Sequence, residues 1–197
     1  MEAEAPNLPA PVVIGYFAKR RTPRVDWLAA PQVREICSVS ACIAEAPDGW
    51  IDRWTHNHLW VYDTPERARD VVSAAQREHF DLFAYRLVPL LFRDGRTEPL
   101  ELPPTAPSPI PEGFEALGFD AVSRSAGTSF ECSPLSCCNL AGAHGANEWC
   151  LFDSSERAAA AAAEWSRGGA EPGPYVVIEV LRQRAAGLPA TPPAAEA

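Results

Sequence analysis

Apolar positions along the chain fall into short runs, and the most informative run occurs twice. Residues 57–68 have the sequence N-H-L-W-V-Y-D-T-P-E-R-A, and residues 147–158 have the sequence N-E-W-C-L-F-D-S-S-E-R-A. At the common offset of 90 residues, five positions are identical and three are conservative exchanges. We therefore predict a tandem duplication, in which both halves of the chain fold in the same way.

Each copy has the pattern of a strand followed by a helix and another strand. The apolar runs at 59–62 and 149–152 are aromatic and branched, which is typical of a strand buried on both faces. In the first copy Asp63 or Thr64 can cap the next helix, and Glu66 occupies the capping-box position. The second copy repeats this pattern. The elements expected downstream are helices over 65–78 and 155–167 and strands over 83–92 and 175–181.

Two more strands are expected outside the repeated stretch. Residues 12–17 and residues 117–124 each contain a glycine followed by an aromatic residue, within an apolar run. A basic cluster, Lys19-Arg20-Arg21 with Arg24, follows the first of these strands, and we interpret it as a solvated strand end. Residues 26–33 can form a short helix, which Pro31 interrupts.

The predicted fold class is α/β, with α+β as the alternative, and it contains two duplicated strand-strand-helix-strand units. One unit alone would bury only about 60% of its unfolded surface, so we expect the two to pack into one body. Six prolines between Pro99 and Pro111 indicate an extended connector. The expected organisation is a disordered tail at 1–10, a first unit at 11–93, the connector at 94–113, a second unit at 114–184 and a disordered tail at 185–197.

Charge narrows the range of partners. The 197-residue chain is acidic, with a formal net charge of −9, which argues against nucleic acid or an anionic membrane surface as the main partner. The first residues lack the basic-then-apolar plan of a signal peptide, and no apolar run approaches the length of a membrane span. We therefore expect a cytoplasmic protein with a protein partner.

The cysteines are the strongest chemical signal. In a cytoplasmic protein, six cysteines are expected to be thiols or metal ligands rather than disulfides. Four of them form two C-x4-C pairs, Cys37 with Cys42 and Cys132 with Cys137. If the two copies face each other and these segments are looped, the four thiolates could converge on a zinc ion. The alternative is that the cysteines are buried free thiols.

A second group of candidates lies in the segment that makes the first copy longer than the second. Trp50 and Trp54 flank a turn, where aromatic side chains can anchor a protein interface or fold back over the sheet. His56 and His58 lie two residues apart, which suits a metal, an acid/base pair or an exposed surface. We predict that these four residues contact a protein partner.

Catalytic signals are weaker. A cysteine nucleophile needs a neighbouring base, and residues 137–138 with His144 are the best pairing in the sequence. Arg124, Ser129 and Glu179 are a trio of the kind found in NAD-handling transferases, but any chain of this length supplies such a trio. No phosphate-binding glycine loop, H-E-x-x-H or G-x-S-x-G is present.

Two hypotheses for function follow from these signals. The first is a non-catalytic binding or regulatory protein that acts through protein–protein contacts at the aromatic segment of the first copy. The second is a metalloprotein or cysteine-dependent enzyme that uses the two C-x4-C segments. The sequence leaves open whether the protein is an enzyme.

Overall fold

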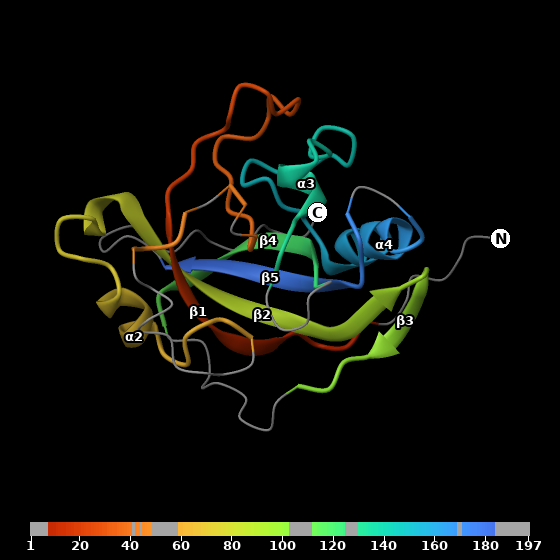
Figure 1. Ribbon diagram of the computed structural model, residues 1–197, viewed down its shortest axis with the longest axis horizontal. Coiled ribbons are helices and arrows are strands. Elements are labelled where there is room, and N and C mark those ends of the chain that lie inside the picture. The colour runs from red at the N-terminus through yellow and green to blue at the C-terminus, as the bar shows by residue number, and fades with distance from the viewer. Residues whose placement is uncertain are drawn as a thin grey trace, which may run out of the picture.

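The fold is a mixed α+β structure built on an antiparallel sheet (Figure 1). This computed structural model describes residues 8–40, 42–43, 45–48, 59–102, 112–124, 130–168 and 171–183. The strands are β1 (Val12–Arg20), β2 (Phe80–Arg93), β3 (Arg96–Pro99), β4 (Phe114–Ser123) and β5 (Tyr175–Gln183). The helices are α2 (Pro65–Asp70), α3 (Pro134–Cys137) and α4 (Ser155–Trp165), with a 3-10 turn at Arg77–His79.

The sheet has the strand order β1-β2-β5-β4, and β3 forms a hairpin with β2. The two inner strands pair with each other, so strands from the two predicted units meet at the centre of the sheet. Both inner strands are nearly continuous apolar runs, because both of their faces are buried. Leu87, Val88, Val177 and Ile178 have no exposed surface. The predicted strands at 83–92 and 175–181 are confirmed.

One helix packs against each half of the sheet. α2 packs against β1 and β2, and α4 packs against β4 and β5. The helix expected over 155–167 is confirmed as α4, whose alanines allow close approach to the sheet. The helix expected over 65–78 is much shorter, ending at Asp70. Residues 73–75 are exposed, so packing against the sheet does not stabilise further helical turns.

Both helices begin at a hydroxyl side chain. Thr64 is the cap of α2 and accepts a hydrogen bond of 3.3 Å from the backbone N–H of Arg67. Ser154 caps α4 in the same way, through the N–H of Arg157 at 3.3 Å. The preceding aspartates form salt bridges of 3.3 Å instead, Asp63 with Arg67 and Asp153 with Arg157. Of the two cap candidates predicted for the first helix, Asp63 and Thr64, the structure therefore selects Thr64.

The runs at 59–62 and 149–152 are not regular strands, so this part of the prediction is wrong. Each run makes a single antiparallel bridge to the outer strand of its own half. The bridges join Tyr16 to Tyr62 and Phe119 to Phe152, each through two hydrogen bonds of 2.8 Å. The aromatic residues that end the two runs, Tyr62 and Phe152, are nevertheless deeply buried, as the apolar pattern predicts.

Left-handed backbone explains why these runs are not extended. Trp60 and Cys150 have φ angles of 60° and 61°, which an extended strand does not tolerate. Each run then passes very close to a glycine in a bulge of the outer strand. A Cβ at Gly15 or Gly118 would lie 2.6 or 2.5 Å from the carbonyl oxygen of the bridging residue. Glycine is therefore required at both positions.

Other segments differ from expectation or lie outside the described ranges. Residues 26–33 form turns rather than a helix, in keeping with Pro31. The connector starts as the β2–β3 hairpin, whose two-residue turn is Asp94-Gly95 with φ angles of 51° and 72°. Its residues 103–111, the tail residues 1–7 and 185–197, and Arg184 at the end of the second unit are not among those described. Within the described ranges, no helix has the length and apolar character needed to cross a bilayer.

Candidate functional site

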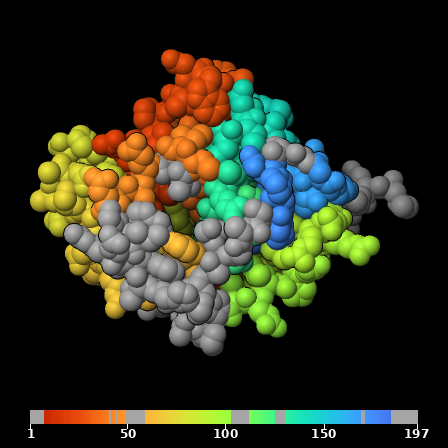
Figure 2. All heavy atoms as spheres, viewed as in Figure 1, coloured from red at the N-terminus to blue at the C-terminus, as the bar shows by residue number. Residues whose placement is uncertain are grey.

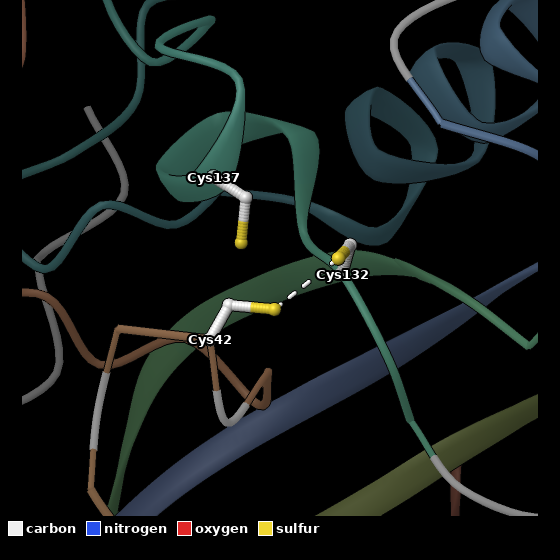
Figure 3. A group of neighbouring side chains, drawn as sticks. All are labelled: Cys42, Cys132 and Cys137. Atoms are coloured by element: carbon white, nitrogen blue, oxygen red, sulfur yellow. Dashed lines mark hydrogen bonds between the residues drawn. The ribbon is translucent and has the colours of Figure 1, made fainter.

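Three of the four paired cysteines come together. The sulfur atoms of Cys42, Cys132 and Cys137 all lie within 4.8 Å of one another (Figure 3). The Sγ atoms of Cys42 and Cys132 lie 3.2 Å apart. We call these three residues the thiol cluster. Figure 2 shows the segment after β1, in red and orange, beside the segment after β4, in teal, and the cluster is formed where these two segments meet.

Cys37, the fourth predicted ligand, is not part of the cluster. It is buried in the core, and its backbone N–H donates to the carbonyl of Trp149 at 3.0 Å. Burial raises the pKa of its thiol, and the charge of Glu35 raises it further. Cys150 is also fully buried, and burial raises its pKa to about 12. Cys37 and Cys150 therefore fit the alternative of buried free thiols.

The second cysteine segment is looped, which is the condition that convergence requires. Glu131 and Cys132 pair with Ser123 at the end of β4, through backbone hydrogen bonds of 2.9 Å. Pro134 then begins α3, a single turn that ends at Cys137. Cys132 lies before this turn and Cys137 at its end, so the chain folds back between them, whereas an extended strand would point residues five apart to opposite faces. The two thiols of this segment therefore face the same place.

A buried lysine shapes the first cysteine segment. Lys19 is 3% exposed, and its Nζ donates to the carbonyls of Ser38, Val39 and Ser40 at 2.9, 2.5 and 2.7 Å. The prediction that Lys19 belongs to a solvated strand end is therefore wrong. Burial lowers its pKa to about 7, against the opposing charge of Asp120. The three carbonyl acceptors match the three N–H donors of an ammonium group, so these hydrogen bonds favour the protonated form of Lys19.

Asp120 ties the two cysteine segments together. One oxygen, Oδ2, accepts hydrogen bonds of 2.9 Å from the hydroxyl of Ser38 and the backbone N–H of Val39. The other, Oδ1, accepts one of 2.6 Å from the hydroxyl of Ser133. Burial raises the pKa of this carboxyl, and the three hydrogen bonds act against that rise. Because Ser133 follows Cys132 directly, one carboxylate positions both arms of the thiol cluster.

Ser40 makes a second link between the arms. Its hydroxyl donates to the carbonyl of Glu131 at 2.5 Å and accepts from the backbone N–H of Cys42 at 3.1 Å. The same oxygen lies 3.6 Å from the sulfur of Cys137. The sulfur of Cys42 is 3.5 Å from the carbonyl of Glu131. Ser40 thus contacts the cluster directly and fixes the relative position of its two segments.

The three thiols differ in acidity and access. Burial on its own would raise the pKa of Cys42, but hydrogen bonds from Ser40 and the other two thiols outweigh it, and the pKa is lowered. Burial raises the pKa of Cys132, and its hydrogen bond with Cys42 raises it further. Burial also raises the pKa of Cys137. Cys42 is exposed, whereas the other two are half-buried, so Cys42 is both the most acidic and the most accessible.

The remaining candidates do not form a second site among the described residues. Trp50, Trp54, His56 and His58 lie outside those residues, as does Ser129, so the contacts predicted for them stay predictions. The proposed nucleophile and base have separate neighbours. Cys138 lies 3.5 Å from a carboxylate oxygen of Glu171, while the ring of His144 packs edge-on against Trp165, with 5.0 Å between ring centroids.

A groove of about 870 Å³ lies beside α2 and the adjoining strand ends. Its lining is strongly charged, but the charges largely neutralise one another. Arg21 pairs with Asp81 at 3.0 Å, and Arg182 pairs with Glu35 at 2.9 Å. A groove whose charges are already paired gives no indication of what it would bind. The thiol cluster therefore remains the strongest site.

Sequence reasoning missed Lys19 and Asp120, the two residues that organise the cluster. For Asp120 the available signal was a charged side chain within a predicted apolar strand, whereas Lys19 follows its predicted strand beside two arginines and carries no such signal. Comparisons of the chain with protein-family models, with curated proteins and with solved structures found no match. Function therefore has to be argued from the cluster itself.

Proposed function

We propose that this protein is a metalloprotein that holds a thiophilic divalent ion, with zinc the leading candidate, in the thiol cluster. The observation that carries the proposal is the meeting of three cysteine sulfurs, contributed by two remote segments, within 4.8 Å. This is the second of the two hypotheses that the sequence offers, with Cys42, Cys132 and Cys137 as ligands and Cys37 as a buried thiol.

The chemistry of the ligands suits zinc. Thiolates bind Zn²⁺ at about 2.3 Å, which in a tetrahedral site separates the sulfurs by roughly 3.8 Å. Only small adjustments of the cluster are needed to reach that spacing. Three protein ligands leave the fourth position to water or another external ligand, as in zinc sites that react rather than only stabilise. The buried-thiol alternative does not account for an exposed cysteine such as Cys42.

The surroundings of the cluster also support a ligand site. Metal ligands are usually held by a further layer of hydrogen bonds, and losing one of those bonds weakens metal binding by roughly 10- to 100-fold. Here Ser40 and Asp120 supply such bonds to both segments. A buried carboxylate and a buried ammonium are costly to keep in a core. Their use to position a loop is consistent with a site that needs precise geometry.

The test is zinc binding by the reduced full-length protein. We expect one equivalent of zinc in a competition titration against a chelator, and a thiolate-to-metal charge-transfer band when cobalt replaces zinc. Cys42→Ser, Cys132→Ser and Cys137→Ser should each weaken binding by roughly a hundredfold or more, because each removes a ligand. Cys138→Ser is the matched control, since this neighbouring thiol is outside the cluster. Wild-type protein without affinity for zinc or cobalt would contradict the proposal.

We also propose that the two halves of the chain are copies of one unit. Support comes from features that recur at the 90-residue offset. Hydroxyl caps stand at Thr64 and Ser154, and left-handed residues stand at Trp60 and Cys150. Each half also has a bridge beside a bulged glycine. If the two halves had evolved independently, each would have had to acquire all of these features in the same order.

A further inference from the structure

We infer that Cys42 and Cys132 are a redox-active dithiol, whose oxidation to a disulfide empties the metal site. The disulfide chemistry stands on the geometry of this pair, whereas the loss of metal rests on the function proposed above. The protein would then bind metal only in its reduced state. The agent that switches it would be a small-molecule disulfide of the glutathione type.

The geometry of the pair carries this inference. The two Sγ atoms lie 3.2 Å apart and point toward each other (Figure 3). A disulfide bond is about 2.05 Å long, so the sulfurs need to approach by only about 1.2 Å. The two residues come from segments 90 positions apart, and these segments are already fixed side by side by Ser40 and Asp120. Closure therefore requires no rearrangement of the fold.

Cys137 is the competing partner, and its contacts argue against it. Its sulfur lies 3.6 Å from the Ser40 hydroxyl and 3.8 Å from the Ser136 hydroxyl. Its backbone is held in the single turn of α3, where its N–H donates to the carbonyl of Ser133 at 2.8 Å. Cys137 is therefore positioned as a third thiol beside the pair rather than as a member of it.

The reaction balances with the small disulfide as oxidant. The Cys42 thiolate attacks one sulfur of the disulfide, whose S–S bond breaks, and one small thiolate leaves and takes up a proton. Cys132, after losing its proton to solvent, attacks the Cys42 sulfur and displaces the second small thiolate. Two protein thiols lose two electrons, and the small disulfide gains them as two thiols. Cys42 is the point of entry because it is the exposed member of the pair.

Oxidation and metal binding exclude each other. A sulfur in a disulfide is no longer a thiolate and is lost as a metal ligand. After closure only Cys137 remains of the three ligands. A single thiolate does not hold zinc against a competing chelator, so we expect one zinc released for each disulfide formed.

The experiment uses reduced full-length protein, loaded with zinc or kept zinc-free, in buffers of increasing oxidised-to-reduced glutathione ratio. Intact mass, peptide mapping after alkylation and a colorimetric zinc chelator are read in parallel. We expect a Cys42–Cys132 disulfide in both preparations, with equimolar zinc release from the loaded one. Zinc-free Cys137→Ser should still form this disulfide. Cys132→Ser should stop at a mixed disulfide with glutathione on Cys42. Cys138→Ser should behave as wild type.

Three results would overturn the inference. These are a disulfide that joins Cys42 to Cys137, the absence of any disulfide under conditions that oxidise a model dithiol, and a Cys42–Cys132 disulfide that forms with zinc retained. Failure of the proposed function is distinguishable from all three. It would show earlier, as absence of zinc binding by the reduced protein before any oxidant is added.

Discussion

Lys19 and Asp120 are charged residues in an apolar interior, and each has three hydrogen-bonding partners. Burial of an isolated charge is strongly unfavourable, so such residues persist only when their polar atoms are satisfied. Here the partners belong to the two cysteine segments. The hydrogen bonds of Lys19 and Asp120 therefore hold these segments in place and so position the thiols.

Replacing Lys19 tests this role. Lys19→Met keeps the apolar stem but leaves three buried carbonyls without a donor, and it leaves the Asp120 charge without its nearby cation. We expect a loss of roughly 3 kcal/mol or more in the free energy of unfolding. Zinc affinity should also fall at least tenfold, because the loop that carries Cys42 is released. Denaturant titration and a chelator competition assay measure the two effects.

The neighbouring residue provides the control. Arg20 forms an exposed salt bridge of 2.9 Å with Glu45, so Arg20→Met should cost about 1 kcal/mol or less and leave zinc affinity unchanged. Equal effects of the two substitutions would show that Lys19 has no special part in the site.

Residue identity alone allowed part of this site to be predicted. The C-x4-C spacing and its recurrence were sufficient to select Cys42, Cys132 and Cys137 as candidates. They were not sufficient to exclude Cys37, because its burial depends on packing against residues distant in sequence. Lys19 was assigned to a solvated cluster because it adjoins two exposed arginines. Nothing local distinguishes a lysine that meets carbonyls 20 residues away from one that meets water.

At the scale of elements, helix starts are the most clearly repeated feature. Thr64→Ala and Ser154→Ala should each cost about 1 kcal/mol of stability, because each removes the hydroxyl that accepts a hydrogen bond from a free N–H in the first turn of its helix. The two losses should add in the double variant, since the caps belong to different helices. Denaturant unfolding monitored by circular dichroism measures them.

Asp63→Ala and Asp153→Ala serve as controls for the capping argument. Each removes a half-exposed i,i+4 salt bridge to an arginine, worth about 0.3–0.5 kcal/mol. Aspartate variants that cost as much as the hydroxyl variants would show that the carboxylates, rather than Thr64 and Ser154, stabilise the helix starts.

Apolar periodicity located the long elements correctly. It failed where residues adopt left-handed backbone conformations. β2, β5 and α4 are long, and their patterns are unambiguous. The runs at 59–62 and 149–152 have strand-like composition, but Trp60 and Cys150 adopt left-handed conformations that composition does not reveal. The Asp94-Gly95 hairpin was also not predicted, although the sequence does contain a signal for it. Its turn signal was present, but it lay at the edge of a proline-rich stretch that dominated the interpretation.

At the scale of the molecule, the two halves share one sheet. β2 belongs to the first half and β5 to the second, and they pair from Phe83 opposite Arg182 to Phe92 opposite Tyr175. The thiol cluster also takes residues from both halves. Neither half is therefore complete without the other, although the connector that joins them is rich in proline.

Cutting the connector tests this dependence. A protease site introduced between Pro103 and Pro109 should be cleaved without separating the halves, because the central strand pair and the buried core remain. Gel filtration of the cleaved protein should show both fragments in one peak at the position of the uncut protein. Two separate folded fragments would show that the halves are independent domains, contrary to the predicted single body.

Tyr62 and Phe152 also determine how the sheet ends. β1 and β4 are the outermost strands of the four-strand path, and an outermost strand normally offers unpaired N–H and C=O groups to a strand of another molecule. At Tyr16 and Phe119 these groups are already used within the chain. The adjacent bulges also interrupt the regular spacing that an incoming strand would need. The fold thus limits edge-to-edge aggregation at both outer strands, by the same short contacts that require glycine beside them.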